Sequence, residues 1–414
     1  MIQQFTINTA FYMLMPYLAA HLADDLAMAA STVGLVLGVR NLSQQGLFLV
    51  GGTLADRLGC IPVMLAGCAL RTAGFALLGF SAELPALLAA SAMTGFAGAL
   101  FNPAVRAHLA AEADGRRVEA FAAFNVFYQA GVFAGPLVGL ALLSVDFRVV
   151  CSVAAGLFAV LTAVQARQLP AARTARADAP VPDGEAGAGG SVLADWRSVV
   201  ANRPFLLFSS AMIGSYVLSF QVYLALPLAA QGLAGAHGQA VTSALFALSA
   251  LVAAAGQMRI TAWAKARWSP ERALVRGLAL MGLAFAPLLL DGRSAAGGAA
   301  GAAFRLAPLF AAAALIALAT AVLYPFEMDT VVALARGRLV ATHYGLYNTF
   351  AGLGITVGNL AVGALWDRAH AAGAPAVVWL ALTGTGLLCA LAVAGLARTG
   401  SLRAGAPKPE LASA

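Results

Sequence analysis

Charged side chains are scarce in this sequence. Only 10% of its 414 residues are Asp, Glu, Lys or Arg, while 61% are hydrophobic and the mean hydropathy is +0.83. Soluble domains carry about 25% charged residues, so this composition excludes an ordinary soluble protein and predicts an integral membrane protein. The hydrophobic residues do not alternate with polar ones, and Ala and Leu dominate, which favours membrane helices over a β-barrel.

Cysteines and enzyme motifs are also few. The four cysteines lie far apart along the chain and predict neither a disulfide framework nor a metal site. No nucleotide-binding P-loop, H-E-x-x-H zinc motif or G-x-S-x-G nucleophile turn is present. The glycines of residues 352–358 are spaced as in a dinucleotide loop, but that run follows no strand. We therefore expect no enzyme activity and no cofactor, and any driving energy has to come from an ion gradient or from the substrate.

Long hydrophobic runs, by contrast, recur along nearly the whole chain. A helix needs about 20 apolar residues to span a bilayer, so the runs predict about twelve transmembrane helices. The first run has neither a preceding basic region nor a small-residue cleavage site, which favours a retained helix over a signal peptide. The predicted spans are 2–22, 31–51, 62–81, 84–110, 120–144, 148–167, 204–230, 240–262, 272–290, 305–326, 343–365 and 376–397.

Basic residues fall mainly on one side of these predicted spans. Because cytoplasmic loops are enriched in Lys and Arg, this distribution places both termini in the cytoplasm of a cell whose cytoplasmic membrane holds the protein. The net charge of +7 then reflects topology and requires no nucleic-acid partner. The basic residues on the opposite side are Arg148, Arg293, Arg305 and Arg368.

The chain divides into two similar halves. The segment 170–190 is rich in Ala, Pro, Gly and Asp and reads as a flexible linker. Within the first run of each half, residues 12–16 recur in pattern at 223–227. Parallel repeats of this kind bind their substrate between them. The predicted domains are a six-helix half at 1–169, a cytoplasmic linker at 170–200, a second six-helix half at 201–398 and a cytoplasmic tail at 399–414.

The repeat also exposes a difference between the halves. The seventh run begins near Pro204, and the corresponding position in the first half would precede Met1. We hypothesise that the native start of the protein lies upstream of Met1.

A glycine pattern marks the fifth predicted helix. Gly131, Gly135 and Gly139 share one helix face, which permits close approach of another helix, and Pro136 predicts a bend there. This G-x-x-x-G-P-x-x-G run resembles the fifth-helix antiporter motif of the major facilitator superfamily, in its drug:proton antiporter branch.

A short charged loop follows the second predicted helix. Gly52 and Gly59 would permit a tight turn, and Asp56 and Arg57 supply charges that can pair with neighbouring helix ends. The loop resembles a motif of the same superfamily, which implies a gating role. The family usually has further basic residues just after it, where this chain has 60–62, Cys-Ile-Pro. The alternative interpretation is an ordinary cytoplasmic turn.

Shorter matches extend the resemblance. Residues 40–46, 71–75 and 146–148 resemble the MdtH group of multidrug resistance proteins within that branch. The fourth-helix arginine of the family is replaced by Ser91, so its coupling role does not carry over.

Arg40 is the most informative charge within a predicted span. Such an arginine costs roughly 2.5–3.5 kcal/mol to insert, so it should face a cavity or a partner. With Asn41, Gln44 and Gln45 it forms a polar helix face, which either lines a substrate cavity or ties helices together. We expect Arg71, Arg106, Arg259 and Arg276 to be structural or to reach toward helix ends. Further candidates for the cavity wall are Tyr12, Asn125, Tyr128, Gln221, Tyr223 and Asn348.

Proton coupling requires an acid that changes its protonation state. Glu327 and Asp329 at the inner end of the tenth run are candidates, with structural pairing as the alternative. Asp24 and Asp25 lie outside the first run and fit solvated charges better.

The resemblance implies an all-α major facilitator fold and proton-driven export of small amphipathic compounds, either drugs or a secreted metabolite. The expected partners are a small-molecule substrate, protons and the lipid bilayer, and we expect a monomer. Two other functions stay open: uniport or import of an organic anion, and a non-transporting membrane receptor or scaffold.

Overall fold

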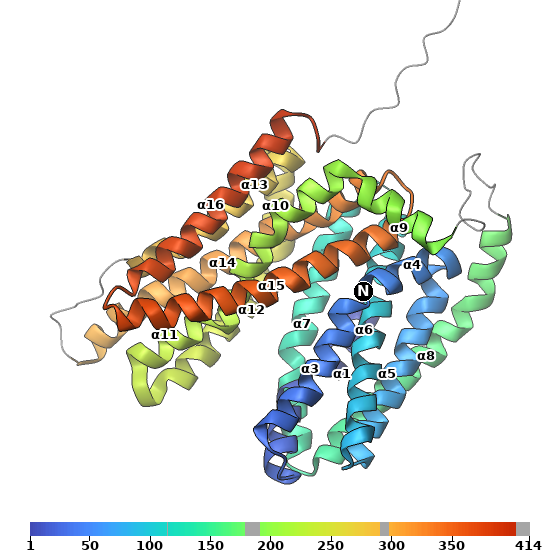
Figure 1. The fold of residues 1–414 in the computed structure, drawn as a ribbon, viewed down its shortest axis with the longest axis horizontal. Coiled ribbons are helices and arrows are strands. Elements are labelled where there is room, and N and C mark those ends of the chain that lie inside the picture. The colour runs from blue at the N-terminus through green and yellow to red at the C-terminus, as the bar shows by residue number, and fades with distance from the viewer. Residues whose placement is uncertain (114, 179–190, 290–297, 403–414) are drawn as a thin grey trace, which may run out of the picture. The chain divides into compact units, whose positions relative to one another are not determined.

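The computed structural model of the chain describes residues 1–113, 115–178, 191–289 and 298–402, and all regular elements in these ranges are helices (Figure 1). The chain divides into two compact units. Unit 1 comprises Met1–Val199, Ala250–Met258 and Leu339–Leu353, and unit 2 comprises Val200–Ser249, Arg259–Arg338 and the chain from Gly354 onward.

The first nine α-helices begin in unit 1. They are α1 (Ile2–Tyr12), α2 (Met15–Ala20), α3 (Ala30–Gly46), α4 (Phe48–Leu58), α5 (Cys60–Phe80), α6 (Leu84–Glu112), α7 (Arg117–Leu143), α8 (Phe147–Asp178) and α9 (Val192–Ala201). A π-helical turn, His21–Asp25, follows α2.

The remaining helices belong to unit 2, apart from the stretches of α12 and α15 assigned to unit 1. They are α10 (Arg203–Ser219), α11 (Ala225–Ala234), α12 (Gly238–Arg267), α13 (Pro270–Leu283), α14 (Gly298–Ala335), α15 (Val340–Ala371) and α16 (Ala376–Arg398). Short 3₁₀ turns occur at Phe220–Tyr223, Gly235–His237 and Ala286–Leu289.

The number of membrane-spanning helices is lower than the twelve predicted and comes close to it when bent helix pairs are counted. In the described ranges, 9 helices are long and apolar enough to cross a membrane, or up to 11 if two bent pairs each count as one span. One pair is α3 with α4, bent by 46° beside Gly46, where a helix is easily kinked. The expected first span is missing from this count because α1 and α2 are separate short helices.

The breaks repeat between the halves. α1 ends at Tyr12, shortly before Pro16, and α10 gives way to the turn Phe220–Tyr223, shortly before Pro227. Proline has no backbone N–H and clashes with the preceding helical turn, so it favours an interruption just before it. The repeat predicted from residues 12–16 and 223–227 is therefore visible in the structure.

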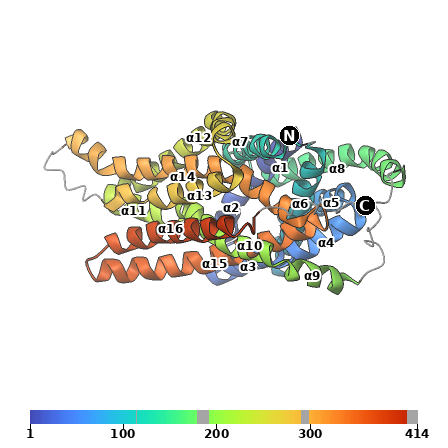
Figure 2. The ribbon, with the colours of Figure 1, turned by 90° about the horizontal axis from the view of Figure 1, so that it is seen from above.

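Side-by-side helices form the core of each unit. In unit 1, α5 packs against α6 and α8, while α1 packs along α7 (Figure 1). Phe75 of α5 and Phe158 of α8 meet in this core and are 0% and 1% exposed. In unit 2, α13 packs against α14 and α16, as Figure 2 shows from above.

The glycine-rich face of α7 forms the contact with α1. A Cβ atom on Gly135 would lie 2.7 Å from Cβ of Tyr12, and one on Gly131 would lie 2.6 Å from Cβ of Asn8. Gly139 faces Met13 in the same way. The close-packed seam predicted from the sequence is therefore present, and α7 continues as an α-helix through Pro136, whose carbonyl accepts a hydrogen bond of 2.7 Å from Tyr17 Oη.

Two expected loops are shorter than predicted. α8 continues to Asp178, so it includes the first part of the segment expected to be a linker. Residues 179–190 lie outside the described residues. α14 begins at Gly298, so the connection between the predicted spans 272–290 and 305–326 is shorter as well.

Candidate functional site

The charged segment between the second and third predicted spans begins in the last turn of α4. Gly59 ends this helix with φ 96°, a conformation that residues with a side chain rarely adopt. Asp56 and Arg57 therefore project from the last turn of α4. The expectation that Gly52 belongs to the turn is wrong, because Gly52 lies within α4, where its missing side chain lets the backbone of Ala341 approach closely.

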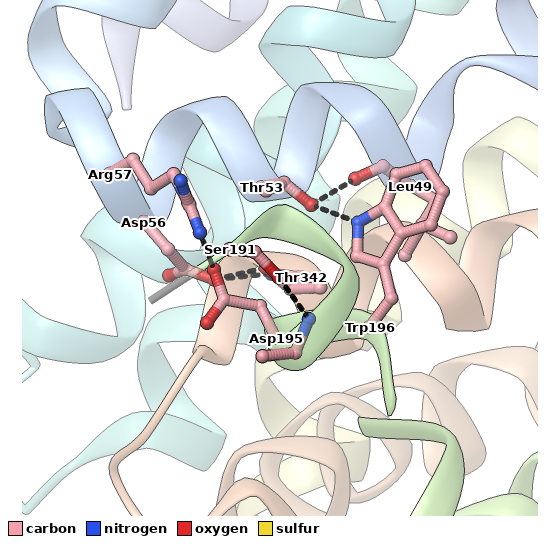
Figure 3. Close-up of polar contacts among 9 residues, drawn as sticks. Leu49, Thr53, Asp56, Arg57, Ser191, Asp195, Trp196 and Thr342 are labelled. Atoms are coloured by element: carbon pink, nitrogen blue, oxygen red, sulfur yellow. Dashed lines mark hydrogen bonds and ion pairs between the residues drawn. The ribbon is translucent and has the colours of Figure 1, made fainter. Parts of the chain in front are cut away.

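Asp56 binds the beginning of α15. Its Oδ1 accepts a hydrogen bond from the backbone N–H of Ala341 at 3.0 Å. Its Oδ2 accepts one from the N–H of Thr342 at 2.7 Å and another from Thr342 Oγ1 at 2.6 Å (Figure 3). The first N–H groups of a helix have no partner within the helix and carry partial positive charge, so a carboxylate there satisfies and stabilises them.

Arg57 binds α9. Its Nε and Nη2 donate to the same oxygen of Asp195, at 2.9 Å and 2.6 Å (Figure 3). The two side chains are 27% and 14% exposed, so the ion pair is largely shielded from water. Next to it, Trp196 Nε1 donates to Thr53 Oγ1 at 2.8 Å, and Thr53 in turn donates to the carbonyl of Leu49.

These contacts join three segments that are far apart in the sequence. We call the group of Thr53, Asp56, Arg57, Asp195, Trp196 and Thr342 the α4 latch. Asp56 and Arg57 were predicted to pair with neighbouring helix ends, whereas the partners on α9 and α15 were missed. In the sequence, Asp195 and Trp196 fall within the predicted cytoplasmic linker 170–200, with no pattern that points to α4.

The polar candidates of the first half lie in unit 1. Arg40 donates to Gln44 Oε1 at 3.1 Å and to Asn41 Oδ1 at 2.8 Å. The hydroxyl groups of Tyr12 and Tyr128 lie 3.3 Å apart. These cavity candidates of the first half therefore lie on α1, α3 and α7.

Asn125 and Asn348 are also in unit 1 and buried. Asn125 Nδ2 donates to Gln257 Oε1 at 2.8 Å, so this amide has a specific partner on α12. Asn348 is 8% exposed, and its Nδ2 is buried without a hydrogen-bond acceptor in the described part of the chain.

Two further candidates, Gln221 and Tyr223, lie in the 3₁₀ turn that follows α10, in unit 2. Gln221 is fully buried, and its Nε2 donates to the carbonyl of Val217 at 2.8 Å and to Asn359 Oδ1 at 3.2 Å. Tyr223 is 60% exposed, with its ring 5.4 Å from that of Phe246.

Glu327 lies inside α14, not at its end, since this helix continues to Ala335. Glu327 is only 4% exposed. It lines a cavity of about 50 Å³ within unit 2, together with hydroxyl-bearing and apolar side chains. The other lining residues are Ser215, Tyr216, Ser219, Met281, Thr320, Leu323 and Tyr324. Asp329 is not among them and is less completely buried.

Arg71 was expected to be structural or to reach toward a helix end, and the structure rules out the second alternative. It lies in the middle of α5 and is 7% exposed. Its Cζ lies 4.6 Å from the ring centroid of Phe11 and 5.3 Å from that of Phe158. Ser91, which replaces the family's arginine, is fully buried in α6.

Comparison with known proteins identifies the family. A family model described as Major Facilitator Superfamily matches residues 1–290. The chain belongs to the major facilitator superfamily. An uncharacterized MFS-type transporter of Mycobacterium tuberculosis strain H37Rv is 52% identical, over 98% of this chain and 93% of that protein. The multidrug resistance protein MdtH of Klebsiella pneumoniae strain 342 is 30% identical, over 95% of this chain and 92% of that protein.

Among solved structures, the crystal structure of the human organic anion transporter MFSD10 (TETRAN) has a TM-score of 0.63. It is 19% identical and covers 95% of this chain and 97% of its own, which shows a shared fold. The expected major facilitator fold and the resemblance to MdtH are thus confirmed. The protein is a multi-pass membrane transporter rather than an enzyme.

Proposed function

We propose that this transporter exports small amphipathic compounds in exchange for protons, by alternating access of a central site to the two sides of the cytoplasmic membrane. Both termini and the α4 latch would face the cytoplasm, as the distribution of basic residues indicates. The antiporter-type glycine seam between α7 and α1 and the likeness to MdtH support this function.

The observation that carries the proposal is the α4 latch. The carboxylate of Asp56 satisfies the N-terminus of α15, and Arg57 binds α9 (Figure 3). These are a few discrete hydrogen bonds and one ion pair, all within reach of the last two turns of α4. Such contacts suit a gate, because they hold one arrangement and can break when the helices move.

Glu327 is the favoured proton site. Its burial beside a small cavity lined by hydroxyl groups gives a carboxyl group a surrounding of low polarity with room for one or two waters. A carboxylate in such surroundings is costly, so gain and loss of a proton would be linked to changes in water access.

The experiment is transport into proteoliposomes under an imposed pH gradient. We would measure accumulation of cationic ethidium and of anionic 2-naphthoate, with and without a protonophore. In the wild type we expect one of these probes to accumulate against its gradient, and the protonophore to abolish this accumulation. The Glu327→Gln variant should lose accumulation but retain exchange of the probe across the membrane at equal pH, because an amide cannot carry a proton.

Two variants provide the comparison. Glu112→Gln removes an exposed carboxylate at the end of α6 and should behave as wild type. Asp329→Asn tests the second acid of α14. Accumulation by Glu327→Gln at the wild-type level would remove Glu327 from the proton path. Wild-type movement of a probe that ignores the pH gradient would favour uniport over antiport.

A further inference from the structure

We propose that Arg40 and Arg71 bind the carboxylate group of an amphipathic organic anion, which would be the class of compound that this transporter carries. The site would serve the transport function proposed above by defining its substrate. Its ligand chemistry is independent of proton coupling and of the direction of transport. We call Arg40 and Arg71 the guanidinium pair.

The guanidinium pair comes together on a ring of α1. Cζ of Arg40 on α3 lies 4.8 Å from the ring centroid of Phe11, and Cζ of Arg71 on α5 lies 4.6 Å from the same centroid. A Cβ atom on Gly98 of α6 would lie 3.0 Å both from Nη2 of Arg71 and from Cδ of Gln44. Gln44 also accepts from Arg40, so this amide lies close to both guanidinium groups.

Neither arginine has an acidic partner in the part of the chain that the structure describes. Arg71 is 7% exposed and makes no hydrogen bond there, and its Nε is buried without an acceptor. Arg40 Nε is also buried without an acceptor. By contrast, Arg57 of the same unit forms an ion pair with Asp195.

The contacts do not fit a structural tie between helices. Both hydrogen-bond acceptors of Arg40, Asn41 and Gln44, lie on its own helix α3. Across helices, the guanidinium groups contact aromatic rings, which is a weaker interaction than an ion pair. Two nearby cations therefore repel each other in a region of low polarity, and no described residue supplies a compensating negative charge.

A bound anion would compensate the repulsion between the two guanidinium groups. A carboxylate has two oxygens that can accept the parallel N–H donors of a guanidinium group, which is a strong, charge-assisted interaction. Aromatic side chains flank the position: Phe11 contacts Tyr12 edge to face, at 5.1 Å between centroids. The Tyr12 hydroxyl lies 3.3 Å from that of Tyr128. Cationic donors beside aromatic rings fit an organic anion with an apolar body.

The test is equilibrium binding to the purified full-length protein in phosphatidylcholine nanodiscs, without any gradient. The probes are 2-naphthoate and 2-naphthamide, which share a ring system and differ in charge. We expect the wild type to bind naphthoate at least tenfold more tightly than naphthamide. Hydrogen bonds to charged groups are worth about 1.5–3 kcal/mol. Arg71→Gln and Arg40→Gln should therefore each lower the affinity for naphthoate about ten- to a hundredfold.

Naphthamide binding should stay unchanged in both variants, which distinguishes lost charge recognition from lost structure. Arg71→Lys keeps the charge without the planar fork, so its affinity for naphthoate should be intermediate. The matched control is Arg276→Gln, which removes an exposed guanidinium stacked 4.8 Å from the ring of Trp268 and should leave naphthoate binding unchanged.

A stability measurement separates a binding site from a structural tie. Without ligand, Arg71→Gln should unfold at the wild-type temperature or above it, because it removes repulsion between like charges. A lower unfolding temperature together with unchanged naphthoate affinity would overturn the proposal. If Arg71→Gln does not fold, the wild-type comparison of the two probes remains decisive, and equal affinity for both would overturn the proposal.

Anionic lipid is the other source of the same chemistry. Replacing half of the phosphatidylcholine by phosphatidylglycerol should leave naphthoate affinity unchanged. Loss of naphthoate binding in these nanodiscs would assign the guanidinium pair to a lipid headgroup and overturn its role as a substrate site. Failure of proton-driven accumulation in proteoliposomes, with binding intact, would reject only the coupling mechanism.

Discussion

The α4 latch and the guanidinium pair are two groups of charges within the same unit, and they are built in opposite ways. In the latch, Arg57 meets the carboxylate of Asp195, and Asp56 meets the N-terminus of α15. In the guanidinium pair, Arg40 and Arg71 share an aromatic ring and have no acidic partner among the described residues. The first group is complete within the protein, whereas the second is complete only with a bound anion.

The difference separates two uses of charge in a membrane protein. A buried or half-buried charge with a full set of partners holds helices in one arrangement, and its loss weakens that arrangement. A buried charge without partners reduces stability in the empty protein, and a ligand is then the partner that removes the cost. Changing charges in the latch should therefore harm stability and transport, while changing charges in the pair should alter ligand binding first.

Removal of the Asp56 carboxylate should have the largest effect. In Asp56→Ala, three hydrogen bonds at the start of α15 are lost, and two backbone N–H groups lose their acceptor. We expect the free energy of unfolding to fall by roughly 2–4 kcal/mol, and transport to fall at least tenfold. Denaturant titration in detergent and flux into proteoliposomes measure the two effects.

The control for Asp56→Ala is Asp367→Ala, which removes an exposed carboxylate near the other end of α15. This variant should stay within about 0.5 kcal/mol of the wild type. If Asp56→Ala transports at the wild-type rate, the contact with Thr342 is not part of the gate.

Giving the guanidinium pair a counter-charge should make it resemble the latch. Gln44→Glu places a carboxylate where an amide already accepts from Arg40 and lies close to Arg71. The unfolding temperature should rise, and naphthoate affinity should fall at least tenfold, because the new carboxylate occupies the donors that the ligand needs. Thermal unfolding tests the predicted rise in unfolding temperature, and equilibrium binding on the same preparation tests the predicted fall in naphthoate affinity.

The control for this change is Gln45→Glu, which adds the same charge one residue along α3, where the amide faces Gly352. Gln45→Glu should neither raise the unfolding temperature nor weaken the binding of naphthoate. Tight naphthoate binding by Gln44→Glu would show that the ligand binds elsewhere.

Weakening the ion pair of the latch should have a smaller effect. Asp195→Asn keeps the shape of the side chain and leaves one hydrogen-bond acceptor for Arg57. Because both residues are partly exposed, we expect a loss of only about 1 kcal/mol. Salt screens such a pair, so the difference from the wild type should shrink between 0.05 M and 1 M NaCl. A loss independent of salt would point to packing of α9 instead.

The sequence predicts the helices that carry both groups of charges. It predicts little of which side chains these charges contact. Hydrophobic runs are long enough to place nearly all spans, and the glycines at 131, 135 and 139 predict a seam because their effect is local to one helix face. Asp56 and Arg57 stand out as charges beside a turn. Their partners Thr342 and Asp195 follow only from the fold, since long-range pairing of side chains leaves no local pattern.

The position of Arg71 also does not follow from the sequence alone. A single arginine in an apolar run fits a snorkelling side chain as well as a buried one, and only the fold places it at the ring that Arg40 also contacts. Glu327 follows the predicted span 305–326 and was expected at its inner end, whereas α14 continues to Ala335 and keeps the residue buried.

The smallest effect should come from the neutral hydrogen bond of the latch. Trp196→Phe keeps an aromatic ring on α9 and removes the N–H that donates to Thr53 Oγ1 at 2.8 Å. A neutral hydrogen bond is worth about 0.5–1.5 kcal/mol, and this one is only part-buried, so the variant should be destabilised by about 0.5 kcal/mol. The matched control is Trp263→Phe, whose indole is 45% exposed and should contribute less. A double-mutant cycle with Thr53→Val isolates the pair, since the valine keeps the shape of the threonine and cannot accept a hydrogen bond. A coupling energy near zero would mean that the hydrogen bond between Trp196 and Thr53 does not help to hold α9 against α4.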